Sequence, residues 1–461
     1  MNDYEIIFRR EHETRRAQKE FWLRADAAYS GGRAYIDQAL IRHVSEVEPE
    51  FEERRRRACY FNYPRRTARL ISQFVLSEQP QRFNASPELV EDFSRNGLRV
   101  NEVMRQLSTC VNCFGLAWVL VDMPAFSGSM DLATKQSQQI RPYARVIKPL
   151  AVTDWHFGAD GRLQWAIIEE TGTIADNPLT PATVSVKRRL WERDRWTLFG
   201  RDESGAVRII DQQEHQLGRV PLIMVEEVDG FGLGANHWFE DVVRISDAIL
   251  NAESEAQMNI IKQMFGLLVV SESFRNSDFS SSSTDTEIRF SHVLARSAAL
   301  WEMPEERGIS RYIAPSGTET SQIRAEIINL KKELFEVIGL AVQKDSQAQQ
   351  TAESKAWDHL NVSQFLASRA DLLEQTELRI WQLMHQWDKS ITTPEISYNR
   401  EFAIVELKDT IEALLNFNSV EAGTEFRREV ARAAVKMLDK IKKIDDSVKL
   451  KIEKEIANDN S

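Results

Sequence analysis

The chain has 461 residues, which is too many for one ordinary hydrophobic core, so we expect two or more structural modules. With 42% hydrophobic and 28% charged residues it is neither disordered nor fibrous, and its apolar runs are far shorter than a membrane span, so we expect a soluble, intracellular protein. The net charge of −11 disfavours a simple basic surface for nucleic acid, and three cysteines are too few for a disulfide framework, which favours a reducing compartment.

The first quarter of the chain is predicted to be mainly helical. A charged segment over 4–24 has apolar residues at helical spacing, and the turn Ser30-Gly31-Gly32 follows it. Residues 52–76 also have a helical pattern, with Pro64 placed where a second helix would begin. A further helical pattern covers 86–114.

Short segments with the composition of strands come next. Residues 116–122 form an apolar run that predicts a buried strand. Further strand-like segments, separated by turns, cover 143–147, 166–170, 183–191, 196–200 and 207–210. Together they predict a mixed or antiparallel β module in the middle of the chain.

Two long helical stretches then surround a small insertion. From Trp238 to Ile260 the apolar residues are three or four apart, which predicts one amphipathic helix. Residues 266–317 change to short strands and a serine-rich loop, and the helical spacing returns over 318–338. A polar run over 343–351 predicts a loop, and a helix of about 55 Å is predicted for 352–389.

This order of elements resembles that of the portal proteins of tailed bacteriophages. Several segments look like the wing region of those proteins: Tyr29-Ser-Gly-Gly-Arg-Ala-Tyr35, Tyr60-Phe-Asn-Tyr-Pro64, Phe114-Gly-Leu-Ala-Trp-Val-Leu-Val-Asp-Met-Pro124 and Arg141-Pro-Tyr-Ala-Arg-Val-Ile-Lys-Pro149. The segment Thr351-Ala-Glu-Ser-Lys-Ala-Trp-Asp-His-Leu360 is similar to the portal signature that begins the long wing helix. The resemblance covers most of residues 25–390.

The resemblance implies an α+β, helix-rich portal fold with wing, stem, clip and crown, assembled as a ring. On this chain the wing would be 1–235 and 353–400, the paired stem helices 236–265 and 318–340, the clip 266–317, the tunnel loop 341–352 and the helical crown 401–461. The wing would end with one short return strand within 391–406, and charged helices over 407–456 would form the crown.

The function implied by the resemblance is that of a non-catalytic channel. The ring, typically of 12 copies, would lie at the unique capsid vertex of the virion after assembly in the host cytoplasm. Double-stranded DNA would pass through it without sequence readout during packaging, retention and ejection. The implied partners are the large terminase, a head–tail adaptor, and the major capsid or scaffolding protein, with no membrane and no cofactor.

Ring symmetry would repeat each exposed charge around the DNA. An acidic lumen would keep the duplex mobile, while isolated polar and cationic side chains would make weak contacts to phosphate. The candidate DNA-facing residues are Lys344, Gln343 and Gln347 in the tunnel loop, and Arg324, Lys331 and Lys332 on the second stem helix. The alternative for the stem residues is a solvated helix face.

Motifs for catalysis or metal binding are incomplete. Cys110-Val-Asn-Cys113 has the spacing of half a zinc site but no second pair, so we expect these cysteines to pack as small apolar residues. Gly230-Phe-Gly-Leu-Gly234 lacks the lysine of a phosphate loop and is better interpreted as a hinge. The sequence has no metal-binding histidine pair and no serine-hydrolase elbow. We therefore expect no catalytic residue and no metal.

A basic block from Arg54 to Arg57 precedes three aromatic residues, Tyr60, Phe61 and Tyr63. These features together could bind nucleic acid, but we favour a solvated helix face with aromatic residues in the core. The tryptophans between 357 and 387 are expected to anchor the core or a subunit interface. Two alternatives stay open: another head–tail structural or adaptor protein, and a nucleic-acid-processing enzyme such as a nuclease or motor subunit.

Overall fold

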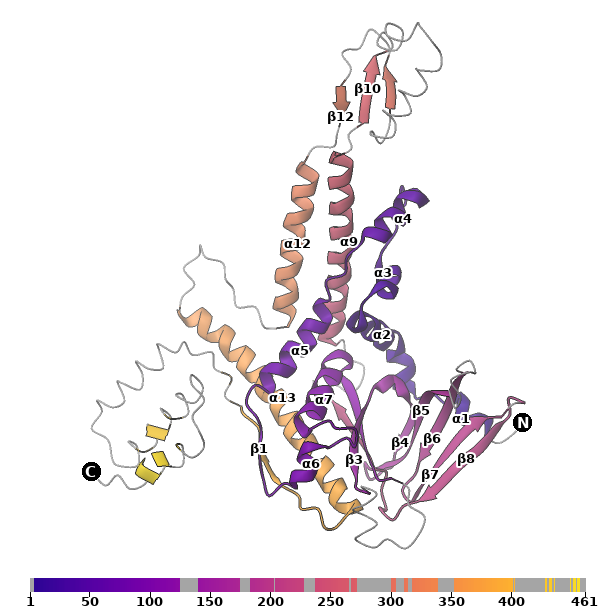
Figure 1. The fold of residues 1–461 in the computed structure, drawn as a ribbon, viewed down its shortest axis with the longest axis vertical. Coiled ribbons are helices and arrows are strands. Elements are labelled where there is room, and N and C mark those ends of the chain that lie inside the picture. Colours follow the sequence, from indigo (N-terminus) through magenta and orange to yellow (C-terminus); the bar gives the residue numbers. More distant parts are fainter. Residues whose placement is uncertain are drawn as a thin grey trace. The chain divides into compact units, whose positions relative to one another are not determined.

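The computed structural model of the chain describes residues 4–400 except for 125–139, 175–182, 203, 228–236, 265–266, 272–299, 304–310, 314–316 and 339–351. Beyond 400 it describes residue 402 and scattered positions between 428 and 456. The chain divides into two compact units, Met1–Glu401 and Phe402–Ser461. The helices and strands from α1 to β13 all lie in the first unit (Figure 1).

Helices were predicted over 4–24 and 52–76, and the structure has five helices between residues 5 and 75. The helices are α1 (Glu5–Arg9), α2 (Glu13–Ser30), α3 (Arg33–Ala39), α4 (Glu48–Arg57) and α5 (Tyr63–Val75). The single helix expected over 4–24 is split, because the backbone is extended at Arg10 and His12. At the predicted turn Gly31 has a φ of +65°, which favours glycine. Pro64 lies in the first turn of α5, where its missing N–H costs nothing.

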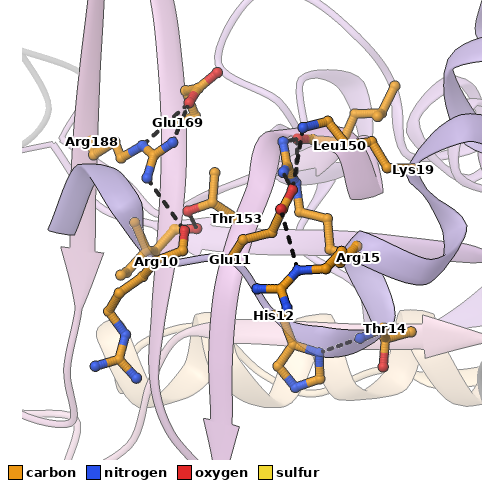
Figure 2. A network of polar contacts seen from close by, with 12 residues as sticks. Arg10, Glu11, His12, Thr14, Arg15, Lys19, Leu150, Thr153, Glu169 and Arg188 are labelled. Carbon is orange, nitrogen blue, oxygen red and sulfur yellow. Dashed lines mark hydrogen bonds and ion pairs between the residues drawn. The ribbon is translucent and has the colours of Figure 1, made fainter. Parts of the chain in front are cut away.

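The extended residues between α1 and α2 attach the start of the chain to the β module (Figure 2). The backbone N–H of His12 donates to the carbonyl of Thr153 at 2.9 Å. Arg15 donates to the carbonyl of Leu150 at 3.1 Å. Arg188 donates to the carboxylate of Glu169 at 2.9 Å and to a backbone carbonyl of α1 at 2.8 Å. These contacts explain why helix 4–24 is interrupted: the broken segment is used for hydrogen bonding to other elements.

A three-stranded sheet with a buried middle strand lies at the centre of the first unit. Its order is β3 (Tyr143–Ile147), β2 (Leu116–Asp122) and β9 (Leu222–Glu226), with both pairings antiparallel. Helix α7 (Val100–Phe114) leads into β2 through Gly115, whose φ is +70°. The short elements α6 (Pro87–Glu91) and β1 (Gln81–Phe83) precede α7, and β1 pairs with β13 (Glu395–Ser397). The buried strand predicted over 116–122 is confirmed.

Four of the five segments predicted for the β module lie in a five-stranded antiparallel sheet in which successive strands are neighbours. It follows the short 3-10 helix η1 (Pro149–Ala151), and its strands are β4 (Val152–Phe157), β5 (Leu163–Ile174), β6 (Thr183–Trp191), β7 (Arg195–Arg201) and β8 (Val207–Glu214). The prediction was wrong for 143–147, which is β3 of the three-stranded sheet, and β4 was not predicted. A shared apolar core joins the five-stranded sheet to β2 and includes Trp118, Trp155 and Trp191. Mixed helix and sheet, the coarse fold class expected from the sequence, is therefore confirmed.

The two long helices predicted around a small insertion are present. Helix α9 (Trp238–Met264) is followed in the chain by β10 (Leu267–Ser271), β11 (Leu300–Met303) and β12 (Arg311–Ile313), and then by α12 (Thr318–Val337) and α13 (Ala352–Trp387). In the small sheet β10 is central, parallel to β11 and antiparallel to β12. None of the helices among the described residues has both the length and the apolar content needed to cross a bilayer.

Candidate functional site

Helices α9 and α12 pack side by side (Figure 1). They run in opposite directions, since Gln263 near the end of α9 donates to Thr320 near the start of α12 at 3.0 Å. On α12, Thr320, Ile327 and Leu334 are buried, and their seven-residue spacing places them in one row. That row faces α9, while most other positions of α12 are exposed. The pair is held together by this apolar seam.

Three of the six predicted DNA-facing residues lie on this pair. Lys331 is half-buried, and its ammonium group lies 3.5 Å from the carboxylate of Glu253 on α9. It therefore forms an ion pair within the chain. Arg324 and Lys332 are exposed on α12. The other three, Lys344, Gln343 and Gln347, lie outside the described residues, as does most of the expected tunnel loop.

Another side of α9 is held by the N-terminal helices through polar contacts. The buried Asp247 of α9 accepts a hydrogen bond from the hydroxyl of Tyr35 and forms an ion pair with Arg24. Burial, and then the bond to Asp247, raises the pKa of Tyr35, so its hydroxyl stays a donor. Asn251, one turn further along α9, accepts from the backbone N–H of Ile41 at 2.8 Å. These contacts attach α9 to α2, α3 and the residues that follow α3.

The basic block of α4 is only partly the solvated helix face that we expected. Arg54 is 3% exposed, pairs with Glu46 at 2.7 Å and donates to Ser254 of α9 at 3.0 Å. The expectation was wrong for Arg54 because α4 packs against α9, and one of four consecutive helical residues must face the neighbour. The other three arginines, Arg55, Arg56 and Arg57, pair with acidic residues and are at least partly exposed. Of the aromatic residues, Tyr60 and Tyr63 are half-buried, whereas Phe61 is exposed.

The base of α9 is anchored by a buried ionic cluster that joins three elements. Glu227 follows β9, His237 precedes α9, and Arg369 lies on α13. His237 Nδ1 accepts from the backbone N–H of Phe239 at 3.3 Å, so its Nε2 carries the proton that is donated to Glu227 at 2.8 Å. Burial alone would raise the pKa of Glu227, but hydrogen bonds from His237 and Arg369 lower it to about 2. The carboxylate therefore stays charged and holds α9 and α13 to β9.

Helix α13 carries a second buried carboxylate. Glu377 is completely buried and accepts from Arg82 of β1 at 2.9 Å and from the hydroxyl of Tyr398 at 2.6 Å. The indole N–H of Trp381 donates to the same carboxylate at 3.2 Å. Trp381 is itself fully buried, which confirms for this tryptophan the predicted role in the core.

A cationic cavity that the sequence did not indicate lies between β9 and α13. Its volume is about 730 Å³, and Arg162, Arg219 and Arg379 line it. Burial, and then the charges of the other two arginines, lowers the pKa of Arg219. Among the described residues Arg219 and Arg379 have no carboxylate partner. Guanidinium groups bind carboxylates and phosphates, so the cavity can hold an anionic group.

The cysteines of α7 pack as apolar residues, as predicted. Cys110 and Cys113 are both buried, and burial raises the pKa of Cys110 to about 12. Within the part of the chain that the structure describes, no three histidine, cysteine or carboxylate side chains are arranged to hold a metal ion. The glycine-rich segment 230–234, expected to be a hinge, lies outside the described residues.

Comparison with known proteins found structural neighbours only. No protein-family model and no curated protein sequence matches the chain. Similar chains occur in the virion of the native gene transfer agent particle (9% identity, TM-score 0.40), in the neck of the native particle computed with C12 symmetry (9%, 0.40) and in the neck of the empty particle computed with C6 symmetry (11%, 0.39). Each similarity covers 80% of this chain and 89% of the other. At these values the likeness assigns no function to this chain.

Proposed function

We propose that the chain is one subunit of a phage-type portal, a ring at the unique capsid vertex through which DNA is packaged and ejected. The observation that carries the proposal is the antiparallel pair α9 and α12, separated in the chain by strands of a small sheet, with a long face of α12 exposed. Within the chain α12 is buried along one seam only, whereas α9 is also covered by the N-terminal helices. Copies repeated around an axis would turn such pairs into the wall of a channel.

DNA would be held loosely in this channel. The net charge of −11 opposes tight binding of phosphate, so the duplex would stay mobile. Among the described residues of α12 the exposed cations are Arg324 and Lys332, and in the tunnel loop Lys344, Gln343 and Gln347 stay candidates. Such contacts would be salt-dependent and would read no sequence.

The subunit itself would be non-catalytic. A separate ATP-driven motor, the large terminase, would move the DNA, and a head–tail adaptor would dock afterwards. The major capsid or scaffolding protein would contact the ring during assembly in the host cytoplasm, and the ring would then remain in the virion.

Native mass spectrometry and two-dimensional electron-microscopy class averages of the full-length chain test this proposal. We expect a closed ring with a central hole, typically of 12 copies. A chain that stays monomeric under all conditions would overturn the proposal. Assembly only on a ring formed by another protein would favour an adaptor, and metal-dependent nuclease or ATPase activity of the isolated chain would favour the enzyme alternative.

The role of the tunnel loop can be tested by Lys344→Ala. If Lys344 contacts phosphate, rings of this variant should retain packaged DNA less well, with the difference shrinking as salt rises. Lys389→Ala, at an exposed lysine beyond α13, is the matched control. Equal packaging and retention by wild type and Lys344→Ala at all salt concentrations would remove Lys344 from the proposed channel contacts.

A further inference from the structure

Helix α12 has two edges of opposite charge, one on each side of its buried seam. Glu326 and Glu333, both exposed, lie on one edge and are seven residues apart. Arg324 and Lys331 lie on the other edge and are also seven residues apart. With the seam at Thr320, Ile327 and Leu334, these are the flanking positions of a heptad pattern. The signs are sorted by edge, unlike the mixture of signs on a typical solvated surface.

An apolar row lies beside the basic edge. Ile328 and Phe335 are 57% and 42% exposed, and each follows a basic residue by four positions. Residues four apart on a helix are neighbours, so each apolar side chain lies next to a cation. Val337, 38% exposed, lies on the acidic side. On both edges, charged side chains therefore lie next to exposed apolar ones. Protein interfaces have the same combination, with an apolar core and a polar rim.

The charges on these edges are not neutralised within the chain. Arg324, Glu326 and Glu333 have no ionic partner among the described residues. The positions three and four away from each of them on α12 carry no opposite charge. Arg324 and Glu326 are only two positions apart and point to different sides of the helix, so they do not pair with each other. Lys331 alone has a partner, Glu253 of α9.

We infer that the basic edge of α12 in one copy contacts the acidic edge of α12 in the next copy, an inference that rests on the proposed ring. A head-to-tail contact joins two different surfaces of one chain, which is what two edges of opposite sign provide. Rotation alone relates the copies, so each residue lies at the same height in all of them. With α12 running along the ring axis, Arg324 lies about 3 Å in height, two residues, from Glu326 of the next copy. Lys331 has the same relation to Glu333.

This assignment changes the role of Arg324. As a DNA-facing residue it would point into the lumen, whereas at the edge of α12 it contacts the next subunit. The contact also covers Ile328 and Phe335, which the chain leaves exposed by itself. Each junction repeats the same contact around the ring, so a modest energy per pair contributes to every subunit boundary.

A charge swap on the full-length chain tests the inference. Arg324→Glu and Glu326→Arg each place like charges across the junction, and we expect each to raise the subunit concentration for half-maximal ring formation about tenfold. The double variant R324E/E326R restores opposite charges and should return to within about threefold of wild type. High salt should reduce the effect of the single variants. Glu88→Arg, at an exposed glutamate of α6, is the control and should assemble like wild type.

The outcomes separate this inference from the proposed function. If wild type forms no ring, the portal proposal fails. If wild type forms rings and the single variants assemble equally well, or the double variant is not rescued, the ring stands and the edge contact is wrong. Circular dichroism of each variant shows whether its monomer is folded.

Disulfide trapping gives a second measurement that does not depend on charge. In a Cys59→Ser background, which removes the exposed native thiol, we introduce Arg324→Cys together with Glu326→Cys. Oxidation of assembled rings should then give a ladder of linked subunits on non-reducing gels, since the two cysteines cannot meet within one helix. The single variant Arg324→Cys should give no ladder. Absence of a ladder from rings carrying both cysteines, after oxidation and also after treatment with a bis-maleimide cross-linker that spans a wider gap, would overturn the contact.

Discussion

Helix α12 and the second half of α13 both have apolar residues at helical spacing, but their surroundings differ. In α13, Ala370, Ile380, Trp381 and Met384 are completely buried. In α12 the seam is buried, but Ile328 and Phe335 beside the basic edge are about half exposed. Periodicity thus indicates that a helix has an apolar stripe, and only the neighbouring elements decide how much of its surface is covered.

The charged residues differ in the same way. The carboxylate of Glu377 on α13 is completely buried and accepts hydrogen bonds from three side chains, while the Lys331–Glu253 pair on α12 and α9 is partly exposed. Buried ion pairs are costly to break, whereas exposed ones contribute little. We therefore expect α13 to determine the stability of the subunit, and the outer surface of α12 to act mainly between subunits.

The largest effect is expected from Glu377→Ala. Removing this carboxylate leaves the guanidinium of Arg82 buried without compensation, which should lower the free energy of unfolding by about 3–5 kcal/mol. Urea denaturation followed by circular dichroism measures it. Glu395→Ala, at an exposed glutamate of β13, should change the free energy by less than about 0.5 kcal/mol. A small effect of Glu377→Ala would mean that α13 is not held by this cluster.

Adjacent residues of α12 give a matched test of its two faces. Leu334→Ala removes a side chain that is 1% exposed in the seam with α9, and should cost about 2–5 kcal/mol of folding free energy. Phe335→Ala should cost less than about 1 kcal/mol in the monomer but weaken ring assembly. Thermal unfolding of dilute subunits and sedimentation of assembled ones measure the two quantities. Equal losses of monomer stability would show that both faces of α12 are covered within one chain.

A pH dependence is expected from Glu227, the carboxylate that joins α9 to α13. Its folded-state pKa of about 2 lies below the ordinary value of 4.5. The charged carboxylate therefore adds about 3 kcal/mol to the free energy of unfolding above pH 4.5, and this contribution is lost as the pH falls toward 2. Glu227→Gln should remove this contribution at neutral pH and flatten the acid limb of the stability curve. Parallel acid limbs for wild type and variant, measured by urea denaturation at several pH values, would contradict the assignment.

The smallest effect is expected from Lys331→Gln. Because the Lys331–Glu253 pair is 3.5 Å long and partly exposed, its loss should cost less than about 1 kcal/mol of monomer stability. The cost should decrease further at high salt. A loss well above this value in dilute subunits would place the pair in the same class as the buried carboxylates of α13.

Short-range chemistry was enough to predict many elements. The break after Ser30 follows from two glycines, the start of α5 from Pro64, and the buried strand β2 from an unbroken apolar run. The small sheet between two helices was also visible as a change of period. Each of these signals depends on residues within one turn or one strand of each other.

Contacts between distant residues were beyond the sequence patterns. In the sequence Arg54 cannot be distinguished from the other arginines of its basic block, and only the packing of α4 against α9 shows that it is buried. The ionic cluster of Glu227, His237 and Arg369 joins three separate elements. The three arginines of the cationic cavity also come from different places: the turn between β4 and β5, the residues just before β9, and helix α13. No local spacing links the members of either group.

The sequence by itself therefore determined the type and order of most of the larger elements, because helix and strand periods are set by the residues nearest along the chain. The tertiary structure decided which charges are buried in pairs and which face of α12 is left uncovered. Burial and ion pairing depend on the elements that meet in space, and an apolar or charged row looks the same in the sequence whether a neighbour covers it or not.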